Sequence, residues 1–167
     1  LIQVVIGPRQ VGKTTGVKQV LENWEGTSLF VSADETQSPS SEWVEFQWDR
    51  ALSRGQGTVL VIDEIQKVKD WSRIIKVLFD RDRLAKRLKI ILLGSASLKI
   101  QNGLTESLLG RYEKIYVPHW TFSECKDCFD WDLRTFVMFG GYPGGAHLIK
   151  EPKRWKRFIR DSIIEPV

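Results

Sequence analysis

The chain has 167 residues, of which 42% are hydrophobic and 28% are charged, and its formal net charge is +4 at pH 7. This is the balance of an ordinary globular protein, and it excludes a low-complexity chain. No signal peptide and no apolar run long enough to cross a membrane is visible, so we expect no membrane partner. The mild positive charge permits an acidic partner without arguing for one.

A strand, a loop and a helix open the chain. An apolar run over residues 2–6, broken only by Gln3, predicts a buried strand, and residues 15–22 have helical spacing. The residues between them read G-P-R-Q-V-G-K-T, which matches the phosphate-binding loop G-x-x-x-x-G-K-T of nucleoside triphosphatases. Strand, loop and helix are the context that this loop requires, because its N–H groups and the helix N-terminus then point at an anion.

The motif assigns roles to individual residues. Lys13 is placed to reach the β- and γ-phosphates, and Thr14 to ligate magnesium. A glycine-containing turn that binds nothing is the alternative. The predicted nucleotide-binding residues are Gly7, Pro8, Arg9, Gln10, Val11, Gly12, Lys13, Thr14 and Thr15.

Residues 27–32 predict a second strand, and Ser40 or Ser41 could cap a helix over residues 42–53. Aromatic side chains of this helix, Trp48 among them, could stack on a base or pack in the core.

A second nucleotide signature follows in residues 58–64, where an apolar run ends in two carboxylates. Such a run fits a strand buried on both faces of a parallel sheet, and ligands bind at the carboxyl ends of such strands. We expect Asp63 to hold hydrated magnesium and Glu64 to act as the general base toward the attacking water. A strand that merely ends in acidic residues is the alternative.

Asp70 can cap a helix over residues 71–86, which ends in a basic run that could face nucleic acid or solvent. Residues 89–94 predict a buried strand, and Ser95 or Ser97 could reach between the γ-phosphate and the water. These serines could instead only satisfy backbone groups at the strand end.

A short helix over residues 104–109 and a strand over 114–117 flank Arg111. An arginine on this turn could meet a γ-phosphate in its own or in a neighbouring subunit, or it could be an ordinary surface residue.

Beyond Pro118 the pattern becomes helical. Thr121 to Glu124 form a capping box, and residues 131–139 and 152–164 predict two further helices around a glycine-rich turn at 140–145. We therefore predict an ATPase core over residues 1–118 and a helical lid, or the start of a second domain, over 119–167. The basic side chains of the last helix could contact nucleic acid or serve solubility.

Cys125 and Cys128 are the two cysteines of the chain. Their C-x-x-C spacing could indicate a redox pair or half of a zinc site, but a redox pair normally opens a helix and this pair falls inside one. Incidental thiols fit a reducing cytoplasm, where we expect the protein.

Four segments together resemble the AAA+ ATPases predicted in archaea and bacteria. These are GPRQVGKTT at 7–15, DEIQKV at 63–68, LGSASL at 93–98 and LLGR at 108–111, and FGGYP at 139–143 is similar to the point where those proteins enter a C-terminal domain of unassigned role. The resemblance implies an α/β fold, a P-loop parallel sheet of the additional-strand type with helices on both faces and strand order 5-1-4-3-2. It also implies Ser95 as the sensor, Arg111 as an arginine finger or nucleotide-sensing arginine, and a C-terminal domain cut short.

These observations predict magnesium-dependent ATP binding and hydrolysis, coupled to remodelling or binding of an unidentified protein or nucleic acid. ATP rests on the resemblance, and the chain lacks the Asn-Lys-x-Asp motif that reads guanine. The alternative is a nucleotide-gated protein- or DNA-binding module with slow or no turnover. A small-molecule kinase is disfavoured by the Asp63–Glu64 pair. The full-length protein could form a homo-oligomer. Four aromatic residues are candidates to line the base pocket: Trp24, Tyr112, Tyr116 and Trp120.

Overall fold

A computed structural model describes residues 1–82, 87–95, 100, 102, 104 and 107–161. The chain divides into two compact units. The sheet unit comprises Leu1–Ile6 and Thr14–Tyr116, and the loop-and-helix unit comprises Gly7–Lys13 and Val117–Val167. This grouping places most of the phosphate loop with the C-terminal helices, whereas the sequence pattern suggested a division after residue 118. The assignment of residues 1–118 as an ATPase core and 119–167 as a lid stays a prediction.

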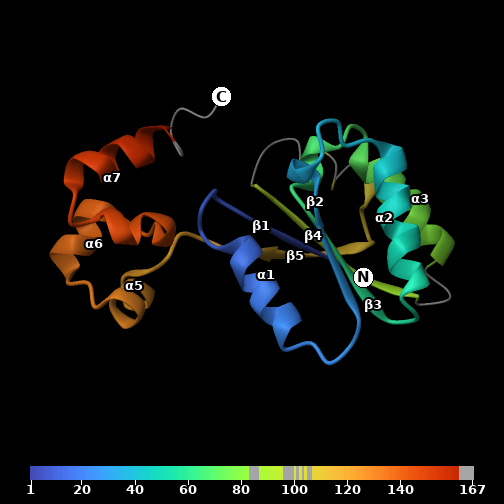
Figure 1. The fold of residues 1–167 in the computed structure, drawn as a ribbon, viewed down its shortest axis with the longest axis horizontal. Helices are drawn as coiled ribbons and strands as arrows, with labels where there is room; N and C mark the ends of the chain where they lie inside the picture. The colour runs from blue at the N-terminus through green and yellow to red at the C-terminus, as the bar shows by residue number, and fades with distance from the viewer. Residues whose placement is uncertain (83–86, 96–99, 101, 103, 105–106, 162–167) are drawn as a thin grey trace. The chain divides into compact units, whose positions relative to one another are not determined.

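The sheet unit is built on a five-stranded sheet with the order β2-β3-β4-β1-β5 (Figure 1). Read from the other edge this is 5-1-4-3-2, so the predicted fold class is confirmed. The β1–β5, β2–β3 and β3–β4 pairs are parallel. The strands are β1 (Ile2–Gly7), β2 (Ser28–Ser32), β3 (Thr58–Asp63), β4 (Leu88–Ser95) and β5 (Tyr112–Tyr116).

Burial along the strands follows their place in the sheet. All six residues of β3 are buried, which fits a parallel strand covered on both faces. The edge strand β5 is instead exposed at four of its five positions and contains charged residues. Since parallel strands end at one edge of a sheet, the carboxyl ends of β1, β3 and β4 gather there.

The longer helices among the described residues of the sheet unit are α1 (Lys13–Glu22), of which Lys13 itself is grouped with the other unit, α2 (Ser41–Ser53) and α3 (Trp71–Asp82). Ser40 is the cap of α2, since its hydroxyl accepts from the Trp43 amide at 3.3 Å. Asp70 was predicted to cap α3 with its side chain, but its φ is 53° rather than extended, and its backbone carbonyl accepts from the first turn. The predicted continuation of this helix over residues 83–86 lies outside the described residues.

The core of the sheet unit is closed by α2 and α3, which pack on each other, while α2 also packs on β3. At their contact the Trp48 indole N–H donates to Asp82 Oδ2 at 2.6 Å, and both residues are buried. Trp48 is therefore a core residue, and its stacking on a base is excluded.

The helices of the loop-and-helix unit are α5 (Phe122–Phe129), α6 (Leu133–Phe139) and α7 (Pro152–Ile159), with a 3₁₀ helix, η3 (Pro143–Leu148). The predicted capping box is present, because Thr121 and Glu124 exchange side-chain and backbone hydrogen bonds at the start of α5. A second small core forms here around Cys125, Trp131 and Phe139. Among the described residues, no helix combines the length and apolarity that a membrane crossing would require.

Candidate nucleotide-binding site

The phosphate loop is wound by unusual backbone angles. Gln10 has a φ of 61° and Gly12 a φ of 94°, which lets the chain turn back toward the start of α1. The Lys13 ammonium donates to the carbonyl of Gly7 at 3.0 Å and also to that of Pro8. The Lys13 side chain is therefore folded back over the phosphate loop, as its place in the motif leads us to expect.

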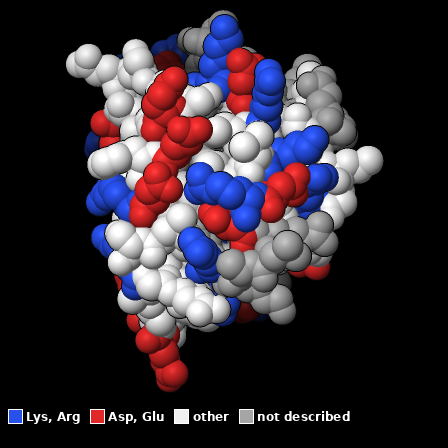
Figure 2. Space-filling view, turned by 90° about the vertical axis from the view of Figure 1, so that its right-hand side faces the viewer, with Lys and Arg blue, Asp and Glu red and all other residues white. Residues whose placement is uncertain are grey.

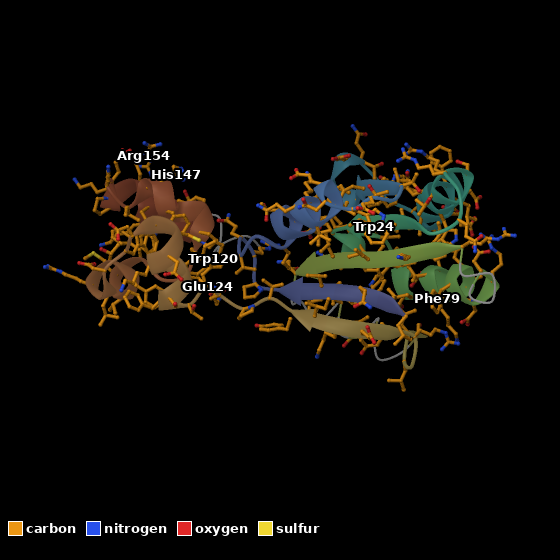
Figure 3. All side chains as sticks on the ribbon, turned by 90° about the horizontal axis from the view of Figure 1, so that it is seen from below. Trp24, Phe79, Trp120, Glu124, His147 and Arg154 are labelled. Atoms are coloured by element: carbon orange, nitrogen blue, oxygen red, sulfur yellow. The ribbon has the colours of Figure 1, made fainter. Side chains whose placement is uncertain are left out.

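Residues from the C-terminal part of the chain hold this loop. A Cβ at Gly7 would lie 2.0 Å from the carbonyl oxygen of Val117, so the close approach requires glycine. The Trp120 indole N–H donates to the Val11 carbonyl at 3.0 Å, and its ring stacks on Phe129 with 5.6 Å between centroids. Trp120 is labelled in Figure 3, beside the helix that Glu124 caps. The sequence offered Trp120 only as a candidate for the base pocket, and no pattern pointed to this contact.

The end of the phosphate loop meets the end of β3. The Thr14 hydroxyl, in the first turn of α1, donates to Asp63 Oδ2 at 2.7 Å. The other carboxylate oxygen of Asp63 accepts from the Glu64 amide at 2.8 Å. Asp63 is 6% exposed, so its orientation is fixed by these bonds and by the buried strand.

The Thr14–Asp63 pair fits a magnesium ion. A hydroxyl and a carboxylate are the hard oxygen donors that magnesium takes, with nucleotide phosphates and water supplying the remaining ligands. The described residues contain no group of three or more His, Cys, Asp or Glu that could hold a metal by itself.

The predicted base follows strand β3, and the predicted sensor is the last residue of the neighbouring strand β4. The side chain of Gln66 joins the two by hydrogen bonds. Glu64 follows β3 in the left-handed conformation, with φ 52°, and opens the 3₁₀ helix η2 (Ile65–Lys67). The Gln66 side-chain amide donates both to the Glu64 carboxylate and, at 3.4 Å, to the hydroxyl of Ser95 at the end of β4. The other sensor candidate, Ser97, lies outside the described residues. Sequence reasoning missed Gln66, because a single glutamine after two carboxylates matches no general pattern.

Arg111 is placed apart from these residues. Its guanidinium makes two hydrogen bonds of 2.8 Å to the Asp80 carboxylate, which raise the pKa of Arg111 above its ordinary value. Arg111 directly precedes β5, and its carbonyl accepts from Ile2 at the start of β1. It therefore lies at the amino edge of the sheet, whereas Thr14 and Asp63 lie at the carboxyl edge. This placement does not support the alternative in which Arg111 meets the γ-phosphate of its own subunit, and the role of Arg111 stays a prediction.

A cavity of about 660 Å³ opens in the sheet unit at the amino ends of the strands. Trp24 and Phe79 line it (Figure 3), as do Leu1 and Leu88. Because this is the edge opposite Asp63, Trp24 is not placed beside the phosphates. The aromatic candidates Tyr112 and Tyr116 lie on β5, at its two ends.

The basic run at the end of α3 is paired with acid in the part that the structure describes. Arg81 lies 3.5 Å from Asp49 and 3.3 Å from Asp82. Figure 2 shows lysine and arginine interleaved with aspartate and glutamate on the face it presents. This arrangement favours the solvated-face interpretation over a nucleic-acid surface.

The two cysteines are free thiols, Cys125 buried and Cys128 exposed. Burial raises the pKa of the Cys125 thiol, so its reactive thiolate form is disfavoured. This supports incidental thiols rather than a redox pair.

A glycine-rich phosphate loop after β1, an Asp-Glu pair after β3 and an additional strand between them define a P-loop nucleoside triphosphatase of the AAA+ superfamily. A family model described as "AAA domain" matches residues 1–126, so the chain belongs to that family. The sequence is also 32% identical over 114 residues to uncharacterized proteins of Mycobacterium bovis and Mycobacterium tuberculosis. That match covers 68% of this chain and 24% of each relative, so the chain spans about a quarter of their length.

Among solved structures, the fold is similar to the Thermotoga maritima RuvB Holliday junction branch migration motor. The TM-score is 0.61 at 16% sequence identity, and the match covers 96% of this chain and 55% of that one. At this identity the likeness concerns the fold alone.

Proposed function

We propose that the chain binds ATP with magnesium and hydrolyses it. The observation that supports this most directly is the 2.7 Å hydrogen bond between Thr14 and Asp63. It joins the last residue of one nucleotide motif to the metal-binding carboxylate of the other. Thr14 directly follows Lys13 in the sequence, so the Thr14–Asp63 pair is one residue away from the lysine of the phosphate loop.

Each residue then has a distinct task. The backbone N–H groups of residues 7–15 receive the phosphates, and Lys13 leaves the Gly7 and Pro8 carbonyls to neutralise the β- and γ-phosphate oxygens. Thr14 and Asp63 hold magnesium, which supplies charge stabilisation on those oxygens. Glu64 takes the proton of the attacking water, and the Ser95 hydroxyl donates to the γ-phosphate.

Arg111 enters this proposal from a neighbouring copy of the chain. Its place at the amino edge of the sheet, opposite the edge where its own Asp63 lies, supports a role in the site of a second subunit. An arginine finger supplied in trans stabilises charge in the transition state and is worth about 10³ to 10⁵ in turnover. The proposal therefore includes a homo-oligomer of the full-length protein in which each site is completed by the next subunit.

Hydrolysis would be coupled to remodelling or binding of a macromolecular partner. The solved structure of similar fold is described as a branch migration motor, and the relatives are uncharacterized, so the partner's chemistry is open. The alternative is a nucleotide-gated binding module with slow turnover. The contact of Trp120, in the segment that leads into the C-terminal helices, with the Val11 carbonyl of the phosphate loop favours it. The two free thiols agree with a cytoplasmic location.

Glu64→Gln tests the proposal. The amide keeps the size of the side chain but cannot take a proton, so phosphate release should fall by about 10² to 10⁴ while the ATP dissociation constant changes little. Release is measured by a phosphate assay and binding by calorimetry, with exposed Glu45→Gln in α2 as the control that keeps wild-type turnover. Full turnover in Glu64→Gln would show that Glu64 is not the base. Nucleotide binding without any release in the wild type would favour the gated module.

A further inference from the structure

Gln66 lies between two groups to which the proposed function gives separate roles. Its amide nitrogen donates to the Glu64 carboxylate and to Ser95 Oγ. We infer that Gln66 is a positioning residue, through which the hydroxyl that contacts the γ-phosphate sets the orientation of the catalytic base. This inference rests on the proposed function and extends it to a residue that has no contact with nucleotide.

The chemistry of a primary amide suits this position. Its nitrogen has two hydrogens and can serve both acceptors at once, which neither a carboxylate nor a single hydroxyl could do. The Ser95 hydroxyl accepts from Gln66 through a lone pair and keeps its own hydrogen for a phosphate oxygen. A continuous hydrogen-bonded chain from Glu64 through Gln66 and Ser95 to the γ-phosphate can therefore form.

The backbone on both sides of Gln66 is fixed by burial. Ile65 is 0% exposed and Val68 is 2% exposed, and both belong to the core of the sheet unit. The turn is closed by hydrogen bonds from the Lys67 amide to the Glu64 carbonyl and from the Val68 amide to the Ile65 carbonyl, at 2.9 and 3.0 Å. The backbone of Gln66 is therefore held in place, so its side-chain amide can orient the Glu64 carboxylate.

Gly94 of β4 leaves room for this amide. A Cβ at position 94 would lie 2.5 Å from Gln66 Oε1 and 2.4 Å from the Ile100 side chain. The Gln66 carbonyl oxygen is buried in this space and has no hydrogen-bond partner among the described residues. Burying an unpaired carbonyl oxygen is unfavourable. In this orientation, however, the amide nitrogen faces Glu64 and Ser95 and can donate a hydrogen to each.

The arrangement makes Glu64 sensitive to the nucleotide state. With ATP, the γ-phosphate fixes the Ser95 hydroxyl, which orders the amide and through it the carboxylate. ADP has no γ-phosphate and leaves the chain of hydrogen bonds incomplete. Because misplacement of a reacting group by about 1 Å can cost about 10²-fold in rate, loss of the amide should reduce turnover strongly without weakening nucleotide binding.

Gln66→Met tests this, since methionine has similar length and volume but no N–H group. We expect kcat for phosphate release to fall about 10- to 100-fold, with KM and the affinity for a non-hydrolysable ATP analogue changed less than about twofold. The same change at exposed Gln56, between α2 and β3, is the matched control and should leave kcat unchanged. Thermal unfolding of both variants shows whether a lower kcat comes from a misplaced Glu64 carboxylate or from a destabilised fold.

A double-mutant cycle with Ser95→Ala provides a readout that a merely structural glutamine would not move. If the two residues act as a unit, Ser95→Ala should lower kcat by a smaller factor in Gln66→Met than in the wild type, the remaining loss being that of the direct contact between Ser95 and the γ-phosphate. Wild-type kcat in Gln66→Met, or losses that multiply in the double variant, would overturn this inference while leaving the proposed function standing. Absence of phosphate release from the wild-type chain would instead overturn both.

Discussion

At the scale of single residues, the hydroxyl of Thr14 has the most direct part in the site. It donates to Asp63 at 2.7 Å from the first turn of α1. In the proposed function, these two side chains would hold magnesium, and the ion would supply charge stabilisation beside the phosphates.

Thr14→Val keeps the shape of the side chain and removes its oxygen. Hydrogen bonds and contacts to charged groups are worth about 1.5–3 kcal/mol, so ATP affinity in magnesium should fall about 10- to 100-fold. Calorimetry with magnesium and with a chelator measures the difference. Thr14→Ser, which retains the hydroxyl, should bind ATP as the wild type does. If Thr14→Val weakens ATP binding by the same factor with magnesium as with the chelator, Thr14 has no role in binding the metal.

Residues that belong to a spaced motif could be predicted from the sequence, while residues that act through a contact in space could not. The pairing of Thr14 with Asp63 follows from two local patterns and the rule that parallel strands end together. Gln66 lies within the DEIQKV segment at 63–68, but the resemblance assigned it no role, and Trp120 belongs to no such pattern. Their roles depend on the neighbouring strand for Gln66 and on a loop more than a hundred residues earlier for Trp120.

At the scale of elements, α2 and α3 are pinned together by one buried hydrogen bond. Trp48 is 1% exposed and Asp82 is 8% exposed, and the indole N–H lies 2.6 Å from the carboxylate. A carboxylate in such a place requires its donors, because an unpaired buried charge is unfavourable. The bond therefore fixes the packing of two helices that cover the sheet behind β3.

Trp48→Phe should lower the free energy of unfolding by about 1–3 kcal/mol, since it retains most of the apolar ring and removes the donor. Urea unfolding followed by circular dichroism measures the change. Trp43→Phe, at a partly buried position of the same helix, is the control and should change stability less. An unchanged midpoint for Trp48→Phe would show that Asp82 is satisfied by Arg81, which lies 3.3 Å away.

The elements themselves were predicted well where burial and side-chain caps decide them. The buried run of β3, the Ser40 cap of α2 and the capping box of α5 are each local signals with a local cause. The start of α3 differed, because Asp70 adopts a left-handed conformation and joins the helix through its carbonyl. A left-handed residue before a helix leaves no local sequence signal in the pattern that predicted the cap.

At the scale of the whole molecule, the position of Arg111 demands a second subunit if the residue is to act in hydrolysis. Asp80 holds its guanidinium at the amino edge of the sheet. There it either contacts the site of a neighbouring subunit or only stabilises the turn before β5. The sequence left this choice open between its own site and a neighbour's. The parallel sheet favours the second choice, because Arg111 directly precedes β5 and so lies at the amino edge, opposite the end of β3.

Mixing two inactive variants distinguishes the remaining choices. Arg111→Ala and Glu64→Gln should each lose turnover alone, yet a one-to-one mixture should recover activity at about a quarter of its sites if each site takes its arginine from the next subunit. Phosphate release from the mixture is the measurement. Asp80→Asn removes the same ion pair but retains the guanidinium, so it should stay active. A mixture as inactive as its components would rule out the arginine finger.

The contacts that Val117 and Trp120 make with Gly7 and Val11 bear on how this protein can be divided. A fragment ending at residue 118 would keep the phosphate-loop motif and the Asp63–Glu64 pair but would lose the Trp120 indole that donates to the Val11 carbonyl. Such a fragment would therefore lack one of the contacts that hold the loop. A change that displaces the segment around Trp120 would leave the Val11 carbonyl without this donor while altering no residue of the loop motif.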